Sequence, residues 1–337
     1  MTSPLRALVA GHLCIDFFPA LDRQPGLEEG ALYPVGPMTT RCGGCVYTTG
    51  VTLAALGVDV RLAAAVGRDE LAPLLVHLLA AEGLDTSRFI AVEASTSYSI
   101  VTQAPGRDRT FWHYPGANRL FDGRSLDLEG IDLLHVGYPS LLEALCLNDG
   151  AMLVDLFVRA RSSGCATSLD LAVVDAAEPD RAARWSRLLA RVLPHTDVVT
   201  PSLDDLSSAL DWPLAADPAG LGEAADKLLS AGAAVVLVTA GAAGLQLATA
   251  DATRLIDTGR LAPLLLGQED LRHREPAVRV PLVAGTTGAG DVATAGFLAG
   301  LLHGKGAVAA TKLAATAAAR HVAGMSPGQG TTRQEVR

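Results

Sequence analysis

The stretch Gly285-Thr-Thr-Gly-Ala-Gly-Asp291 places three glycines and an acid ahead of a helical pattern that runs from Val292 to His303. The residues before it, Val278–Ala284, have the apolar character of a strand. Glycines at such a turn let backbone N–H groups approach a ligand closely, and the start of a helix adds unpaired donors and partial positive charge. The stretch therefore predicts a strand, an anion-binding turn and a helix. Asp291 would repel the anion unless its carboxylate takes part in proton transfer.

Two known glycine motifs do not fit this stretch. A Walker A loop ends in Gly-Lys-Ser/Thr, and there is no lysine here. A dinucleotide-binding fingerprint is matched by Gly288, Gly290 and Ala293, but it also requires an acidic residue about 20 positions later. No Asp or Glu occurs between Asp291 and Glu335. A purely structural turn, in which Asp291 caps the helix, stays open at this point.

Short apolar runs alternate with helical patterns over most of the chain. The expected helices include Val46–Leu56 and Leu71–Ala81. The expected strands are Leu5–Ala10, Val58–Val66, Asp132–Gly137, Ala166–Leu171, Asp197–Thr200, Ala234–Thr239 and Leu245–Thr249. Wholly apolar strands that alternate with amphipathic helices are typical of a parallel sheet covered on both faces. We therefore predict an α/β fold with a doubly wound, mainly parallel sheet flanked by helices.

Two segments, residues 12–42 and 93–118, interrupt this alternation. The second contains two alternating strands about Pro105-Gly106, which predicts a β-hairpin. Because a hairpin inserted into an α/β domain is commonly a lid, the two segments predict a small β-sheet lid. Its aromatic residues and His113 would alternate between a face toward a ligand and a face toward other packing or a second subunit. We expect one domain over residues 1–330 and a tail over residues 331–337.

Composition limits the class of protein and of partner. The 337 residues carry 27 Lys and Arg against 36 Asp and Glu, a net charge of −9 that repels nucleic acid and anionic lipid. Five cysteines, an odd number in a long chain, favour a reduced, cytoplasmic protein. His12 and Asp16 interrupt the apolar run that a signal peptide needs, and the uncharged stretch Leu228–Ala250 contains glycines and predicts two strands. We expect neither nucleic acid nor membrane as a partner.

Taken together, the motifs resemble those of the ribokinase-like (PfkB) carbohydrate kinases. Gly285–Asp291 is similar to the family signature Asp-Thr-x-Gly-Ala-Gly-Asp. Further similar segments follow in the family's order over most of the chain, namely Gly11 with Asp16, Gly43-Gly44, Gly67-Arg-Asp69, Gly116-Ala-Asn118 and Val238–Gly244. Each match alone is weak, whereas six in the same order are specific.

The resemblance implies transfer of the γ-phosphoryl group of ATP to a hydroxymethyl group of a small carbohydrate. Asp291 would be the general base, and the backbone of residues 287–290, with Gly288, Ala289 and Gly290, would form an anion hole. The implied sugar-binding residues are Asp16, Gly43, Gly44 and Thr48. The implied ATP-binding residues are Ser202, Thr239, Gly241, Gly244 and Thr287, with Asp205 holding Mg²⁺ through water. ATP and Mg²⁺ are the implied cofactors, a monovalent cation such as K⁺ is compatible, and a homodimer through the lid is implied.

Three positions depart from the family pattern. Gly285 stands where the family usually has Asp, Thr48 stands where it has Asn, and Ser202-Leu-Asp-Asp205 replaces Asn-x-x-Glu. These changes leave the expected fold intact and the substrate open. A nucleoside kinase of the same fold and a non-catalytic sugar- or nucleotide-binding homologue therefore remain as alternatives.

Two groups of candidate residues are ambiguous. Cys42-Gly-Gly-Cys45 has the spacing of a redox pair or of half a zinc site, but the other cysteines are dispersed singly, so packing is the favoured interpretation. Asp170 and Asp175 follow a predicted strand, and either approach the cleft or cap a helix.

Overall fold

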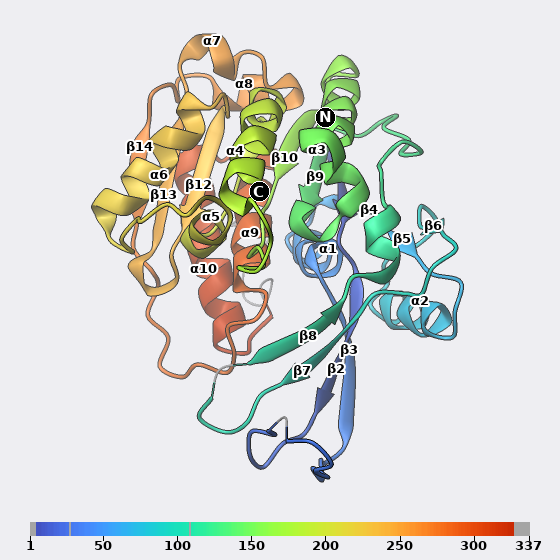
Figure 1. Ribbon diagram of the computed structural model, residues 1–337. Coiled ribbons are helices and arrows are strands. Elements are labelled where there is room, and N and C mark those ends of the chain that lie inside the picture. Colours follow the sequence, from blue (N-terminus) through green and yellow to red (C-terminus); the bar gives the residue numbers. More distant parts are fainter. Residues whose placement is uncertain (1–4, 27, 108, 327–337) are drawn as a thin grey trace.

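The computed structural model describes residues 5–26, 28–107 and 109–326, and its main feature is an eight-stranded sheet between layers of helices (Figure 1). The strand order is β14-β13-β12-β11-β10-β9-β1-β4. Neighbours from β12 to β4 are parallel, whereas β13 and β14 pair antiparallel at one edge. The bounds are β1 Arg6–Gly11, β4 Asp59–Ala63, β9 Leu133–Gly137, β10 Ala166–Leu169, β11 Val198–Val199, β12 Val235–Thr239, β13 Leu245–Thr249 and β14 Arg272–Glu275. The predicted doubly wound, mainly parallel sheet is confirmed.

Helices bury both faces of this sheet because its strands are apolar on both sides. In β1, Leu8 and Ala10 pack into one hydrophobic cluster, whereas Ala7 and Val9 pack into the other. The first cluster includes residues of α3 Glu143–Ser162, α4 Arg181–Val192, α5 Leu203–Leu210 and α6 Pro218–Ser230. The second includes residues of α1 Cys45–Ala55, α2 Leu71–Ala81, α7 Ala252–Leu255, α8 Ala262–Leu265, α9 Ala289–Leu302 and α10 Ala307–Val322.

A separate four-stranded sheet projects from the main body, in the order β3-β2-β7-β8 (Figure 1). Its strands are β2 Cys14–Pro19, β3 Met38–Gly43, β7 Tyr98–Thr102 and β8 Thr110–Tyr114. They lie within the two segments predicted as the lid, except that β3 extends one residue beyond the first segment. Because β2 begins three residues after β1 ends, the lid stands over the carboxyl edge of the central sheet. A two-stranded sheet, β5 Ala65–Val66 with β6 Ile90–Ala91, and five short 3₁₀ helices complete the elements used below: η1 Gly116–Leu120, η2 Pro139–Leu141, η3 Leu193–His195, η4 Gly241–Ala243 and η5 Gly259–Leu261.

Three predicted elements need correction. Val278–Ala284 is not a strand, since it is mostly exposed, contains Pro281 and forms no regular structure. Val58–Val66 is interrupted at Ala64, so its two halves join different sheets. The helix predicted after the glycine-rich stretch, α9, begins at Ala289 rather than Val292, which places Asp291 inside its first turn. The tail at residues 331–337 lies outside the described residues.

The stretch Leu228–Ala250 forms the end of α6, the strand β12, a glycine turn and the strand β13, as its glycines predicted. Across the described ranges, no helix has both the length and the apolar character that a membrane span requires.

Candidate active site

The glycine-rich stretch forms the start of α9. The residue that precedes the helix, Gly288, has φ of +77°, and a Cβ there would lie 3.0 Å from the Thr48 Cγ2 atom, so both conformation and space require glycine. No side chain caps this end of the helix. Asp291 is therefore not the helix cap that remained open from the sequence. The uncapped first turn presents its backbone N–H groups and the positive end of the helix dipole toward the carboxyl edge of the sheet.

Asp291 is almost completely buried, with 4% of its surface exposed. The Tyr138 hydroxyl donates to its Oδ1 atom at 2.6 Å, and the Thr49 hydroxyl donates to the same atom at 3.4 Å. Burial raises the pKa of Asp291 to about 6, although these two hydrogen bonds oppose the rise. The carboxylate is consequently ionised at neutral pH and is still basic enough to take a proton from an alcohol in a transition state.

Two further acids lie near Asp291. Asp170, directly after β10, is buried, and its pKa is raised well above its usual range first by burial and then by the charges of Asp291 and Asp205. Its Oδ2 atom accepts a hydrogen bond from Thr294 of α9 at 3.5 Å. Asp170 therefore lies on the side of Asp291 and α9, and it is not the cap of any helix in the described ranges. Asp175 instead accepts the Ala177 amide at 2.9 Å in an exposed turn.

Asp205 occupies the first turn of α5. Its Oδ2 atom accepts the Ser202 backbone N–H at 2.8 Å, while the Ser202 hydroxyl accepts the Asp205 N–H at 3.0 Å, which is a reciprocal capping box. Burial raises the pKa of Asp205 despite these hydrogen bonds. The acids Asp170, Asp205 and Asp291 thus gather at the carboxyl edge of the sheet, where neighbouring charges act on each other's pKa.

The predicted sugar-binding residues form part of the lid wall. A Cβ on Gly43 would lie 2.1 Å from Oδ2 of Asp16, and a Cβ on Gly44 would lie 2.6 Å from Nδ1 of His12. These short distances explain why both positions are glycine, since a side chain at Gly43 would collide with Asp16 and one at Gly44 would collide with His12. Burial raises the pKa of Asp16, and hydrogen bonds from Ser99 and Cys14 oppose this rise.

Thr48 and Thr49 follow in α1 and face the start of α9. Thr48, which was predicted to bind the sugar, lies against Gly288, whereas Thr49 contacts Asp291. Thr49 was not among the predicted site residues, because it stands in no family motif.

Most of the predicted ATP-binding residues lie together where β11 and β12 end. Ser202 forms a parallel bridge with Thr239, and the Thr239 N–H donates to the Pro201 carbonyl at 3.0 Å. Gly241 and Gly244 follow in the turn to β13, both with positive φ, and a Cβ on Gly244 would lie 2.4 Å from the Glu275 carbonyl oxygen.

Thr287 belongs to the loop before α9. Its carbonyl oxygen lies 2.6 Å from the Nε2 atom of His321 on α10. The neighbouring Thr286 accepts a hydrogen bond from the Arg109 guanidinium at 2.8 Å, so the lid hairpin contacts this loop directly.

Tyr138 and two histidines were also missed from the sequence. Tyr138 comes directly after β9, and a position after a parallel strand was the signal that could have found it. The His12 ring lies beside the rings of Tyr138 and His113, with centroid distances of 5.6 and 5.1 Å. The three rings thus lie next to one another, and the Tyr138 hydroxyl at one end of the group reaches Asp291.

The sulfur atoms of Cys42 and Cys45 contact different backbone groups. The Cys42 thiol lies 4.0 Å from the Leu75 carbonyl oxygen, and the Cys45 thiol donates to the Gly137 carbonyl at 2.6 Å. Both cysteines are buried and free. The contacts agree with the favoured interpretation that these residues pack rather than pair.

Solved structures with the same fold include several kinases, each under 25% identical to this chain. The ribokinase of Arabidopsis thaliana, complexed with ribose and ATP, has a TM-score of 0.74 and 18% identity, with 99% of this chain and 98% of that chain covered. A putative ribokinase II from E. coli, in complex with ATP and Mg²⁺, has a TM-score of 0.72 and 20% identity over 98% and 97%. The Burkholderia thailandensis nucleoside kinase, in complex with inosine, has a TM-score of 0.66 and 18% identity over 98% and 96%.

No curated protein sequence is significantly similar to the chain. The family profile described as pfkB family carbohydrate kinase, in contrast, matches residues 5–331. This match covers nearly the whole chain and confirms the resemblance drawn from the motifs. The protein belongs to the pfkB family of carbohydrate kinases.

Proposed function

We propose that the protein is an ATP-dependent kinase that transfers the γ-phosphoryl group to a hydroxymethyl group of a small carbohydrate. One observation carries this proposal, namely a buried carboxylate, Asp291, in the first turn of a helix whose glycine-rich start has no side-chain cap. A base and an anion-binding backbone are thereby only a few residues apart. Phosphoryl transfer to an alcohol needs both, because the alcohol loses a proton while negative charge develops on the transferred group.

In the proposed reaction, Asp291, the backbone of residues 287–290 and Asp16 have different roles. Asp291 accepts the proton of the attacking hydroxyl, which we expect at Oδ2 because the Tyr138 and Thr49 hydroxyls both bind Oδ1. The backbone of residues 287–290 stabilises the negative charge of the transferred group. Asp16 on the lid wall accepts hydrogen bonds from the sugar hydroxyls.

The residues at the site fit ATP and Mg²⁺. The uncapped start of α9 suits the phosphates, and the open space beside Gly285 and Gly290 leaves room at the backbone. Asp205 and its buried acidic neighbours would hold Mg²⁺ through water, and Ser202, Thr239, Gly241 and Gly244 would bind the nucleotide. Bound Mg²⁺ would neutralise the phosphate charge during transfer. A monovalent cation such as K⁺ remains a prediction.

The lid also supports the predicted homodimer. The register of β7 and β8 places Trp112 and Tyr114 on the face opposite His113, and both aromatic side chains are more than 40% exposed. Strands β3 and β8 form the two edges of the lid sheet. Exposed aromatic side chains beside open strand edges favour association with a second copy. The five free, buried cysteines support the expected cytoplasmic location.

A substrate screen tests the proposal. The full chain is incubated with ATP, Mg²⁺ and one acceptor at a time, including ribose, fructose, 2-keto-3-deoxygluconate and nucleosides, and ADP release is measured. We expect turnover with at least one sugar above the ATP hydrolysis measured without acceptor. Turnover confined to nucleosides would establish the nucleoside-kinase alternative. Binding of ATP without turnover on any acceptor would establish the non-catalytic homologue.

A further inference from the structure

The inner face of the lid carries a row of polar side chains. Residue pairing places Asp16 opposite Ser99 and Ser99 opposite His113, across three adjacent strands. Side chains two residues apart on a strand share a face, so Cys14 lies on the same side as Asp16. The polar side chains of Cys14, Ser99 and His113 consequently lie next to one another over the carboxyl edge of the central sheet.

His12 closes this row from the end of β1. It is 4% exposed, and within the described part of the chain neither of its ring nitrogens has a hydrogen-bond partner. The Nε2 atom of His113 is likewise buried and unpartnered among those residues. Unsatisfied buried nitrogens are rare in folded proteins, and three in one place point to a missing ligand.

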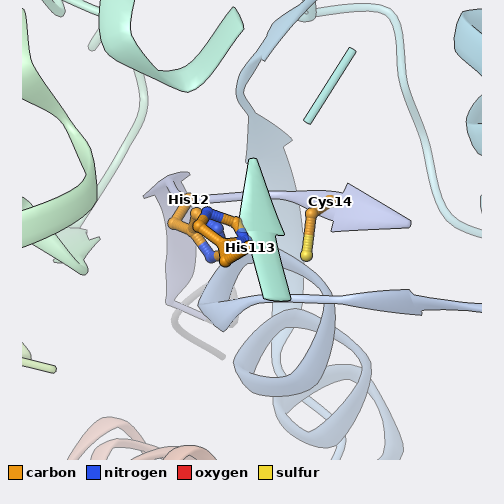
Figure 2. A group of neighbouring side chains, drawn as sticks. All are labelled: His12, Cys14 and His113. Atoms are coloured by element: carbon orange, nitrogen blue, oxygen red, sulfur yellow. The ribbon is translucent and has the colours of Figure 1, made fainter. Parts of the chain in front are cut away.

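Cys14 completes a cluster with these two rings. One ring nitrogen of each histidine and the Cys14 sulfur all lie within 4.8 Å of one another, and Figure 2 shows the three side chains together beside β8. We propose that His12, Cys14 and His113 form a binding site for a divalent metal ion that prefers nitrogen and sulfur ligands, such as Zn²⁺. This ligand class distinguishes the site from the expected Mg²⁺ position, because Mg²⁺ prefers oxygen.

The surroundings hold these ligands in place. The Ser99 hydroxyl lies 3.1 Å from Nδ1 of His113, which restrains the orientation of that ring. The side-chain amide of Asn118 pairs with both backbone groups of Leu13, at 3.1 and 3.3 Å, and so fixes the segment between the ligands His12 and Cys14. In tetrahedral zinc sites the ligand atoms are about 3.3–3.8 Å apart, so contraction by about 1 Å through side-chain rotation suffices.

Metal binding changes one protonation state and no oxidation state. The Cys14 thiol donates to Oδ1 of Asp16 at 3.3 Å, and on binding it releases its proton to solvent as the sulfur–metal bond forms. The resulting thiolate and the adjacent Asp16 carboxylate balance the two positive charges of the ion. Since Asp16 belongs to the proposed sugar wall, an ion here would compete with the sugar. This last consequence alone rests on the proposed function.

Zinc binding to the full chain tests the site without measuring activity. The tag-free protein is stripped with a chelator and dialysed against Zn²⁺, and bound metal is measured by mass spectrometry. We expect one tightly held Zn²⁺ per chain, and at least a tenfold loss of affinity in Cys14→Ala and in His113→Ala. Cys165→Ala is the matched control, because Cys165 is also free and buried but lies at the start of β10, so it should bind Zn²⁺ like the wild type.

Cobalt substitution of the unaltered protein protects the test against variants that fail to fold. A thiolate bound to Co²⁺ gives an intense charge-transfer absorption in the near ultraviolet, which nitrogen and oxygen ligands do not give. We expect this band in the wild-type protein, and we expect added Zn²⁺ to remove it. Absence of the band, or Zn²⁺ retained at wild-type affinity by both ligand variants, would overturn the proposed site whatever the outcome of the substrate screen.

Discussion

Two buried aspartates at opposite edges of the central sheet have very different partners. Asp197, directly before β11, is fully buried and contacts the guanidinium groups of Arg161 and Arg254, the latter at 3.0 Å. Its Oδ2 atom also accepts the Thr167 N–H at 2.9 Å. Asp291, at the carboxyl edge, receives hydrogen bonds from two neutral hydroxyl groups, and the nearby charge acting on its pKa is another carboxylate.

The different partners of Asp197 and Asp291 indicate that the two edges of the sheet have different roles, one in stability and the other in ligand binding or chemistry. Two arginines partly offset the cost of burying Asp197, whose pKa burial still raises, and each of these charges depends on the others as partners. Among the described residues no ion pair involves the acids Asp170, Asp205 and Asp291 at the carboxyl edge, and burial raises their pKa, so they are destabilising when ionised. Proteins keep such groups where they are needed for binding or catalysis, and ligands of open α/β sheets bind at the carboxyl edge.

Replacement of the proposed base should have the largest effect. We expect Asp291→Asn to lower turnover by about two to four orders of magnitude, because the amide cannot accept the proton of the alcohol. ATP affinity, measured by calorimetry, should be close to that of the wild type. Asp204→Asn is the matched control, since Asp204 is an exposed acid on α5, and it should keep normal turnover. Near-normal turnover in Asp291→Asn would remove Asp291 from the mechanism.

The same substitution at the other edge should act on stability. We expect Asp197→Asn to lower the free energy of unfolding by about 3–4 kcal/mol, because it removes the carboxylate that pairs with Arg254 and leaves Arg161 only its pair with the exposed Asp257. Urea titration followed by circular dichroism measures this change. Asp257→Asn also removes an ionic partner of Arg161, but the Asp257 side chain is 70% exposed, so a loss below about 1 kcal/mol is expected. Equal losses of unfolding free energy in Asp197→Asn and Asp257→Asn would show that the burial of Asp197 does not make its ion pairs more important than an exposed one.

At the carboxyl edge, in contrast, Asp291→Asn should stabilise the protein. The pKa of Asp291 is raised from 3.8 to about 6, so the folded state binds more protons than the unfolded state between these pH values, and stability falls as pH rises through this window. Above pH 6 the ionised carboxylate costs about 2–3 kcal/mol. We therefore expect Asp291→Asn to unfold at a higher urea concentration than the wild type at pH 8 and at a similar one at pH 4. No gain at pH 8 would mean that the buried charge is compensated.

The pH dependence of activity follows from the same pKa. A base must be unprotonated to act, so kcat/KM should fall about tenfold per pH unit below pH 6 and level off above it. Rate measurements from pH 4.5 to 8 with a saturating concentration of ATP would show this limb. An unchanged rate down to pH 4.5 would exclude a base with a raised pKa.

The sequence predicted the central sheet and the start of α9 well, but not every strand. The alternating apolar runs predicted the central sheet because a strand buried on both faces has to be apolar throughout, as β1 and β12 are. The glycine pattern predicted the start of α9 because Gly288 has a conformation and a contact that exclude a side chain. Val278–Ala284 has the apolar composition of a strand but no partner strand, and composition alone does not determine whether a partner exists.

The partners of the reactive group could not be predicted in the same way. Tyr138 and Thr49 reach Asp291 from positions 153 and 242 residues away in the chain, and neither stands in a motif that identifies it. Asp170 was recognised only as a residue after a strand, with two interpretations open. A pairwise contact of this kind depends on how β9, β10, α1 and α9 pack, and sequence periodicity carries no information about it.

The weakest hydrogen bond to Asp291 should give the smallest measurable effect. Thr49 donates to Oδ1 at 3.4 Å, which stabilises the ionised form slightly, so Thr49→Val should move the acidic limb of kcat/KM upward by a few tenths of a pH unit. Val has the shape of Thr without the hydroxyl, and turnover at pH 8 should change little, because Asp291 stays ionised there. Thr48→Val is the matched control on the same helix, since Thr48 packs against Gly288 rather than Asp291. In this variant kcat/KM should fall at the same pH as in the wild type. A downward shift in Thr49→Val, or equal shifts in both variants, would show that the Thr49 hydroxyl does not set the basicity of Asp291.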